Sequence, residues 1–321
     1  MRVTTALALA LLTPAAIAAE KAEYPTRPIR LIVPFAPGGS VDISSRIVAA
    51  PLSEILGQQV VVDNRAGGGG SIGATLVAKG AADGYTLLAG SSGSVTANPA
   101  LYSKLPYDPN RDFAPISMIN VTPMAIITHP SVTVTSVKDL VALARSQPGK
   151  ITMASAGTGS SNHLAIELFQ LTSGAKVLHV PYKGSGAALA ELVGGQVQTM
   201  IDQIASSIGY VRDGRLRILA VTSLNRSGVL PNVPTADETG LKGYEAASFT
   251  GILAPAGTPK PVVDKLHAAV VKAATLPAVT AKFKDMAADP KTTTPAEFST
   301  FIRNDIAKWK KVTSAANLRL D

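Results

Sequence analysis

The sequence contains no cysteine, which excludes disulfide bonds, thiolate metal sites and a cysteine nucleophile. A lipid anchor on a cysteine at a mature N-terminus is excluded for the same reason. Aromatic residues make up only 5% of the chain, whereas a nucleic-acid surface combines stacking rings with a basic stripe. The short motifs of serine hydrolases, HExxH zinc peptidases and P-loop proteins are also missing. These absences count against an enzyme and a nucleic-acid partner, and we expect neither a cofactor nor a metal ion.

The basic residues are scattered along the chain, although the formal charge is +8. The only dense basic cluster is Lys308-Trp309-Lys310-Lys311, inside a predicted C-terminal helix. We interpret this cluster as a solvated helix face. The net charge is a weak indication of a small anionic ligand.

The first residues have the pattern of a secretory signal peptide. Arg2 precedes an apolar core over residues 6–12, and Ala16-Ile17-Ala18 forms a small-x-small cleavage site. The apolar core is too short to span a membrane, and no other segment has an uninterrupted apolar run of spanning length. We therefore expect a signal peptide over residues 1–18, cleavage after Ala18 or Ala19, and a soluble protein free in the periplasm.

Short apolar segments rich in β-branched residues alternate with segments of helical periodicity. The predicted strands are 29–33, 60–62, 86–88, 124–128, 151–154, 177–180, 199–201 and 216–221. The predicted helices include 41–56, 71–80, 136–146, 161–172 and 185–194, and the chain is mainly helical from about Pro259 onward. Continuously apolar strands alternating with helices predict parallel sheets covered on both faces. A chain of this length exceeds the usual size of one core, which suggests two doubly wound α/β lobes and a helical tail.

A glycine pair follows the first predicted strand, in the segment PFAPGGSVD. Gly38 and Gly39 can expose backbone N–H groups without a Cβ in the way, and Ser40 is a plausible N-cap of the following helix. Free N–H groups and the positive end of a helix together form an anion site without any cationic side chain. Asp42, two residues after this cap, is expected to stabilise its own helix start.

A similar joint follows the strand predicted at 151–154. Its loop is Gly157-Thr158-Gly159, and Ser160 or Ser161 is the expected cap. The two joints together favour an anion site with one end on each lobe. His163 lies in the first turn of the second helix, where packing is the simpler role and donation to a ligand the alternative. Asp202 ends a strand and could face the cleft, where it would bind an amino group, a hydroxyl group or water.

The segment GGGSIG, from Gly68 to Gly73, matches the dinucleotide-binding pattern GxGxxG. Five residues separate it from the preceding strand, where that fingerprint needs a tight turn. The acidic residue at the expected spacing, Asp83, lies in a turn. We therefore interpret this segment as a strand-to-helix loop in which Arg65 pairs with a carboxylate.

Several segments carry a further resemblance, among them PFAPGGSVD, ASAGTGSSNHLAIELF, VPYKGSGAALAELVGGQVQTMID and GILAPAGTPKPVVDKL. Together and in this order, over essentially the whole mature chain, they resemble the Bug family. These proteins are the periplasmic solute-binding receptors of tripartite tricarboxylate transporters. The resemblance implies a type II periplasmic-binding-protein fold: two doubly wound α/β lobes joined by two crossing strands, closing on a ligand. Two features depart from the family pattern, Pro51 inside a helix and Ala66 in the loop NRAGGGG, and we expect the site to survive both.

The resemblance also implies a small organic carboxylate as ligand, transporter subunits in the membrane as partners, and a monomer. The crossing strands are expected near residues 121–123 and 247–248. Lobe 1 would then be 24–122 plus 247–321, and lobe 2 would be 123–246. The candidate ligand-binding residues are Phe35, Gly38, Gly39, Ser40, Asp42, Ser92, Gly157, Thr158, Gly159, Ser160, Ser161, Asn162, His163, Asp202 and Ser248. Which carboxylate is bound stays open, and presentation of the ligand to a periplasmic sensor is an alternative output.

Overall fold

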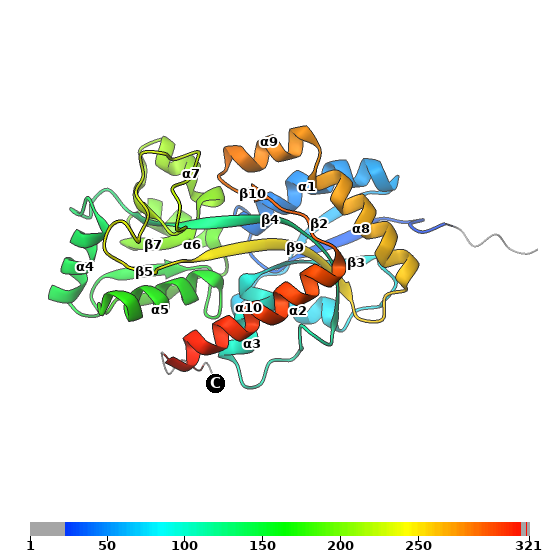
Figure 1. The fold of residues 1–321 in the computed structure, drawn as a ribbon, viewed down its shortest axis with the longest axis horizontal. Helices are drawn as coiled ribbons and strands as arrows, with labels where there is room; N and C mark the ends of the chain where they lie inside the picture. The colour runs from blue at the N-terminus through cyan, green and yellow to red at the C-terminus, as the bar shows by residue number, and fades with distance from the viewer. Residues whose placement is uncertain (1–22, 316–318, 320–321) are drawn as a thin grey trace, which may run out of the picture.

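A computed structural model describes residues 23–315 and residue 319 of the chain (Figure 1). The predicted signal peptide lies outside the described residues. Over the described part of the chain, no helix combines the length and the apolar character that crossing a membrane requires.

The chain alternates strands and helices up to residue 221 and continues with a long strand and a helical tail. The strands are β1 Ile29–Val33, β2 Val60–Asn64, β3 Thr86–Ser91, β4 Phe113–Thr128, β5 Thr152–Ser155, β6 Leu178–Pro181, β7 Thr199–Gln203, β8 Arg217–Val221, β9 Ala247–Pro255 and β10 Asp289–Pro290. The α-helices are α1 Ser40–Leu56, α2 Ser71–Ala78, α3 Asn98–Leu101, α4 Val137–Ser146, α5 Ser161–Ser173, α6 Ser185–Val193, α7 Ile204–Arg212, α8 Lys260–Ala274, α9 Pro277–Asp285 and α10 Pro295–Ala315. Two short elements complete the fold, the 3₁₀ turn η1 Gly68–Gly70 and the π-helical turn η2 Ser92–Ala97.

The strands form two sheets that share β4. In the first sheet β2, β1 and β3 are parallel, and β9 and β4 continue it in antiparallel pairing. In the second sheet β6, β5 and β7 are parallel, while β7 and β8 pair antiparallel with β4. The expectation of purely parallel sheets is therefore wrong at β4, β8 and β9, because an apolar pattern indicates burial and does not indicate strand direction.

The strand β4 is long enough to serve both sheets. It pairs with β9 up to the register pair Pro123 and Ala247, and from Met124 onward it pairs with β7 and β8. Figure 1 shows β4 and β9 running side by side between the two ends of the molecule. The strand predicted over 116–128 lies inside β4.

Both faces of each sheet are covered by helices, which explains the continuous apolar pattern of the strands. Leu31 in β1 packs in a core with α1, α8 and α9, while its neighbour Ile32 packs on the opposite face with α2 and α10. In the second sheet Ile126 faces α4 and α5, and Ile127 faces α6 and α7. Successive strand residues point to opposite faces, so a strand buried on both faces needs apolar residues at every position.

Candidate functional site

A small cavity lies between loops that follow the strands of the first and the second sheet. Its lining consists of Phe35, Gly39, Ser40, Val41, Ser91, Ala156, Ser161, Asn162, Ser185 and Gln203. These residues include the first or preceding residue of four helices, α1, α5, α6 and α7. The cavity volume is about 10 Å³, which is room for one water molecule at most.

The first residues of α1 present free backbone N–H groups to this cavity. Gly39 is the N-cap, with φ −83° and no side-chain cap, so the prediction of Ser40 as N-cap is wrong. Ser40 is instead the first helical residue. The first backbone bond of the helix runs from Ile43 N to Gly39 O (2.9 Å), so the N–H groups of Ser40 and Val41 have no intrahelical acceptor. The positive φ of the turn belongs to Gly38 (85°) rather than to Gly39.

Asp42 holds this loop in place. Its carboxylate accepts hydrogen bonds from Gly38 N (3.0 Å), Arg46 Nε (3.0 Å) and Asn64 Nδ2 (3.0 Å). Burial alone raises the pKa of Asp42, but the hydrogen bonds from Arg46, Gly38 and Asn64 hold the pKa below its usual value. Asp42 therefore has the structural role at its own helix start that the sequence indicates.

The start of α5 repeats the arrangement on the side of the second sheet. Ser160 is the N-cap, and its Oγ accepts the N–H of His163 (3.3 Å), as predicted. The loop before it turns at Gly157 (φ 125°) and Gly159 (φ 84°), values that favour glycine. Gly159 N donates to His163 Nδ1 (3.2 Å). The N–H groups of Ser161 and Asn162, the first two helical residues, remain open to the cavity.

His163 is bound into this loop on both sides of its ring. Its Nε2 lies 3.4 Å from Glu167 Oε1, and the ring stacks on His179 with centroids 4.1 Å apart. His179 in turn hydrogen-bonds Ser155 Oγ (2.6 Å). Burial, together with the neighbouring His163, lowers the pKa of His179 to about 4. The structure therefore gives His163 the packing role, outside the cavity lining.

Asp202 lies behind the cavity wall and has no exposed surface. Its Oδ1 accepts hydrogen bonds from Asn162 Nδ2 (2.8 Å) and Ser185 Oγ (2.8 Å), and its Oδ2 accepts one from Ser206 Oγ. Burial raises the pKa of Asp202 above its ordinary value. The carboxylate thus orients the side chains of two lining residues and does not itself line the cavity.

Sequence reasoning missed five lining residues, Val41, Ser91, Ala156, Ser185 and Gln203. Ser91 ends β3 at the start of η2, and Ser94 Oγ accepts its N–H (3.1 Å) in a capping-box arrangement. The Ser91 hydroxyl itself is buried without a partner at hydrogen-bonding geometry. Ser185 and Gln203 stand where a helix begins after a strand, and this position is the signal that could have found them.

Of the predicted residues, the structure brings together Phe35, Gly39, Ser40, Ser161 and Asn162 around the cavity. The others lie in the flanking loops or behind the wall. Thr158 O contacts Gly69 of η1, since a Cβ at Gly69 would lie only 2.1 Å from it. Ser92 Oγ accepts Phe249 N (3.4 Å), and Ser248 Oγ donates to Phe249 O (3.4 Å), so both serines lie where β9 meets η2.

The lining carries no formal charge. None of the described residues around the cavity is a lysine or an arginine, and among the described residues no group of histidines and acids could hold a metal ion. The GxGxxG segment forms η1 and the start of α2, and Arg65 pairs with Asp63 (3.0 Å), as expected for a loop. An anion in the cavity would be bound by neutral donors and helix ends.

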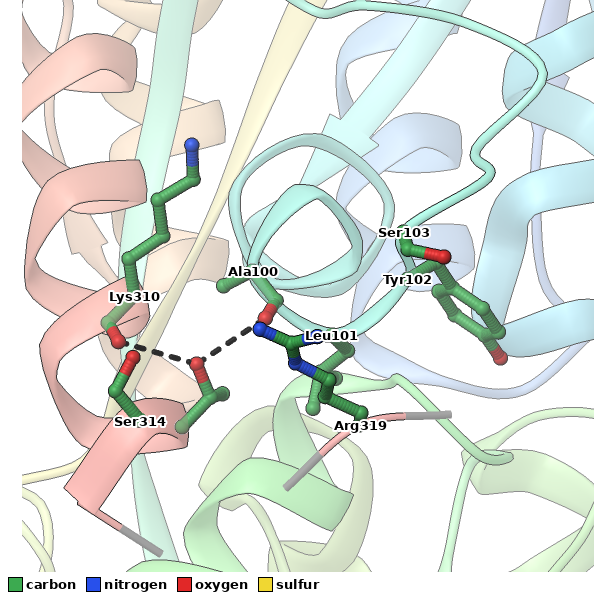
Figure 2. Close-up of a pocket in the computed structure, with 8 residues that line it drawn as sticks. Ala100, Leu101, Tyr102, Ser103, Lys310, Ser314 and Arg319 are labelled. Atoms are coloured by element: carbon green, nitrogen blue, oxygen red, sulfur yellow. Dashed lines mark hydrogen bonds between the residues drawn. The ribbon is translucent and has the colours of Figure 1, made fainter. Parts of the chain in front are cut away.

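A larger surface hollow of about 580 Å³ lies elsewhere, between α3 and α10 (Figure 2). Thr313 Oγ1 bonds Ala100 O (3.1 Å) and Lys310 O (3.2 Å) across it. Figure 2 shows the Lys310 side chain pointing away from Arg319, so the two cations do not converge. This hollow lacks the converging helix starts of the small cavity.

Comparisons with known proteins agree with this site. Residues 44–318 match the model of the tripartite tricarboxylate transporter family receptor. The chain is similar to the protein BugT of Bordetella pertussis, with 40% identity covering 92% of this chain and 91% of BugT. An R. palustris protein solved with adipate superposes with a TM-score of 0.89 at 38% identity, covering 92% and 99% of the two chains. MatC of Rhodopseudomonas palustris, solved with bound malate, gives a TM-score of 0.87 at 33% identity, covering 90% and 99%. The chain therefore belongs to the tripartite tricarboxylate transporter receptor family, a family of periplasmic solute-binding receptors and not of enzymes.

Proposed function

We propose that this protein captures a small organic carboxylate in the cavity between its two sheets and delivers it to a tripartite tricarboxylate-type transporter. The observation that carries the proposal is the convergence of four helix starts on a buried cavity without a cationic side chain. Ser91 adds a buried hydroxyl that has no other partner. The relatives solved with adipate and malate support a carboxylate as the ligand class.

The number of available donors is sufficient for a transport receptor. Hydrogen bonds to a charged group contribute about 1.5–3 kcal/mol each. Four or five of them, after subtraction of the cost of association, leave about 8 kcal/mol, the free energy of a micromolar complex. The free N–H groups of Ser40, Val41, Ser161 and Asn162 supply this number of donors without covalent chemistry.

We further propose that the ligand enters when the two lobes separate, with lobe 1 at 24–122 plus 247–321 and lobe 2 at 123–246. The switch of β4 between its partners at Pro123 and Met124 supports this division. Across the cavity Ala36 N donates to Lys183 O (3.1 Å), and the remaining space is too small for an organic acid. The receptor would work as a monomer in the periplasm after removal of its signal peptide.

A thermal-shift screen over organic acids tests the proposal. A ligand that binds only the folded state adds RT ln(1 + [L]/Kd), about 2.7 kcal/mol at a hundredfold excess over Kd. At least one acid should raise Tm, and its fully amidated neutral analogue should not. Equal shifts for acid and neutral analogue would contradict the anion site. Uptake of the acid that is lost on deletion of the receptor would support delivery to a transporter over presentation to a sensor.

A further inference from the structure

The wall of the cavity that the second sheet supplies carries hydrogen-bond acceptors. Asn162 Nδ2 donates to Ile201 O (2.8 Å) and to Asp202 Oδ1 (2.8 Å). Both partners can only accept, so the orientation of the Asn162 amide is determined by its neighbours. No described residue donates to its Oδ1. Because Asn162 lines the cavity, its amide oxygen is available to accept a hydrogen bond from a ligand.

Ser185 presents the same polarity. Its hydroxyl donates its single hydrogen to Asp202 Oδ1 (2.8 Å), so only lone pairs remain for a ligand. The side-chain donors to Asp202 are the neutral groups of Asn162, Ser185 and Ser206. No described cation pairs with Asp202, and its negative charge therefore stands directly behind the two acceptors.

The donors lie elsewhere in the lining. On the first-sheet side they are the N–H groups at the start of α1 and the hydroxyl of Ser91. At the start of α5, Ser161 Oγ accepts Gln203 Nε2 (3.0 Å), which leaves its hydrogen free to donate beside the helix N–H groups. A carboxylate that bridges the starts of α1 and α5 uses these donors. The rest of the ligand then meets Asn162 Oδ1 and Ser185 Oγ.

We propose that the ligand is a carboxylate whose second polar group is a hydrogen-bond donor, such as a carboxamide or a hydroxyl, rather than a second carboxylate. This inference rests on the proposed function and adds the substrate class. A second carboxylate would place lone pairs and negative charge against two acceptors and the buried charge of Asp202. A donor group satisfies the acceptors, which would otherwise be buried without partners.

A set of acids of equal shape separates these cases. Succinamate, levulinate and succinate carry NH₂, CH₃ and O⁻ at the same position, and glutaramate, 5-oxohexanoate and glutarate repeat the set with one more carbon. Calorimetry on the full mature protein should give succinamate or glutaramate at least tenfold tighter binding than the matched ketone and the matched diacid.

The variant Asp202→Asn tests the origin of the preference. Its amide oxygen can accept from Asn162 and Ser185, and its NH₂ can donate to Ser206 Oγ, so the fold should persist and is checked by thermal unfolding. The preference for succinamate over succinate should shrink at least tenfold. Asp305→Asn is the matched control, because Asp305 is a buried acid that bonds Thr96 and Trp309 away from the cavity lining. The preference should not change in this control.

Tighter binding of the diacids than of the amides would overturn the inference and leave the proposed function standing. An unchanged preference in a folded Asp202→Asn variant would also overturn it. If neither set binds, the acid found by the thermal-shift screen decides: an acid with a donor group supports the inference, and an acid without one overturns it. A screen in which no acid binds would overturn the proposed function and the inference together.

Discussion

Replacing Gly186 with alanine tests whether the contact between the two sides of the cavity is part of the binding cycle. Gly186 is the second residue of α6, and a Cβ at this position would lie 2.0 Å from Pro37 O, across the cavity. Carbon and oxygen atoms that are not bonded to each other stay more than about 3 Å apart, so the loop around Pro37 would have to retreat by about 1 Å or more. The backbone of Gly186 has an ordinary helical conformation, so alanine introduces no local strain.

The expected result separates closure from folding. Alanine is about 0.5–1 kcal/mol more favourable than glycine inside a helix, so the free energy of unfolding should stay constant or rise. Closure would lose the hydrogen bond from Ala36 N to Lys183 O and the packing around it. A loss of about 1.4 kcal/mol weakens binding tenfold, and we expect at least this reduction by calorimetry with the acid from the screen.

Gly209→Ala provides the matched control. Gly209 lies in α7, and a Cβ there would meet no atom within 4 Å, so affinity should stay unchanged. Small-angle scattering should show compaction on ligand addition for this control and reduced compaction for Gly186→Ala. Wild-type affinity in Gly186→Ala would refute the reasoning, because the loops would then not need to approach as closely as they do in this structure.

Three further predictions concern the same region. Because the pKa of His179 is lowered to about 4, its protonation favours the unfolded state, where the pKa is near 6.5. The free energy of unfolding should therefore be highest above pH 6.5 and fall by up to about 3 kcal/mol towards pH 4; urea unfolding of His179→Gln should show a flatter pH dependence. Ser91→Ala removes a hydroxyl without a partner, so Tm should hold or rise while affinity falls by about the value of one hydrogen bond, 0.5–1.5 kcal/mol; an equal Tm and an equal affinity would remove Ser91 from the site. Gly39→Val should weaken binding more than Lys183→Ala, because a Cβ at Gly39 would lie 3.4 Å from the Cβ of Ser185 and the rest of the valine side chain would crowd that residue; the reverse order in calorimetry would indicate an ion pair with the ligand.

The parts of the fold that were predictable from the sequence are those with strong local signals. Strand β1 was predicted with its observed bounds, and α1 began one residue earlier than predicted, because an apolar run, a glycine pair and an amphipathic stripe follow one another there. Helix α1 also continues through Pro51. The antiparallel pairing of β4 with β9 joins segments far apart in the chain, and no local pattern encodes the direction of such a pair.

The candidate site was predictable only where a loop has a distinctive glycine pattern. The loops at Gly39 and Ser161 were found through their glycines. Ser91, Ser185 and Gln203 were missed, because a single polar residue at the end of a strand has no distinctive signal in the sequence. Their importance arises only when strands β3 and β7 and the start of α6 meet around one cavity.

The pairing of β3 with β9 has a consequence for how the chain acquires its structure. Leu88 of β3 stands beside Leu253 of β9, so the first sheet cannot be completed before nearly all of the polypeptide is available. Non-local pairing of this kind slows folding, because a long loop must close before its contacts form. A chain emerging from the ribosome would therefore remain without its first sheet for most of its synthesis. Slow completion of this kind favours passage across a membrane as an extended polypeptide, with folding afterwards on the far side.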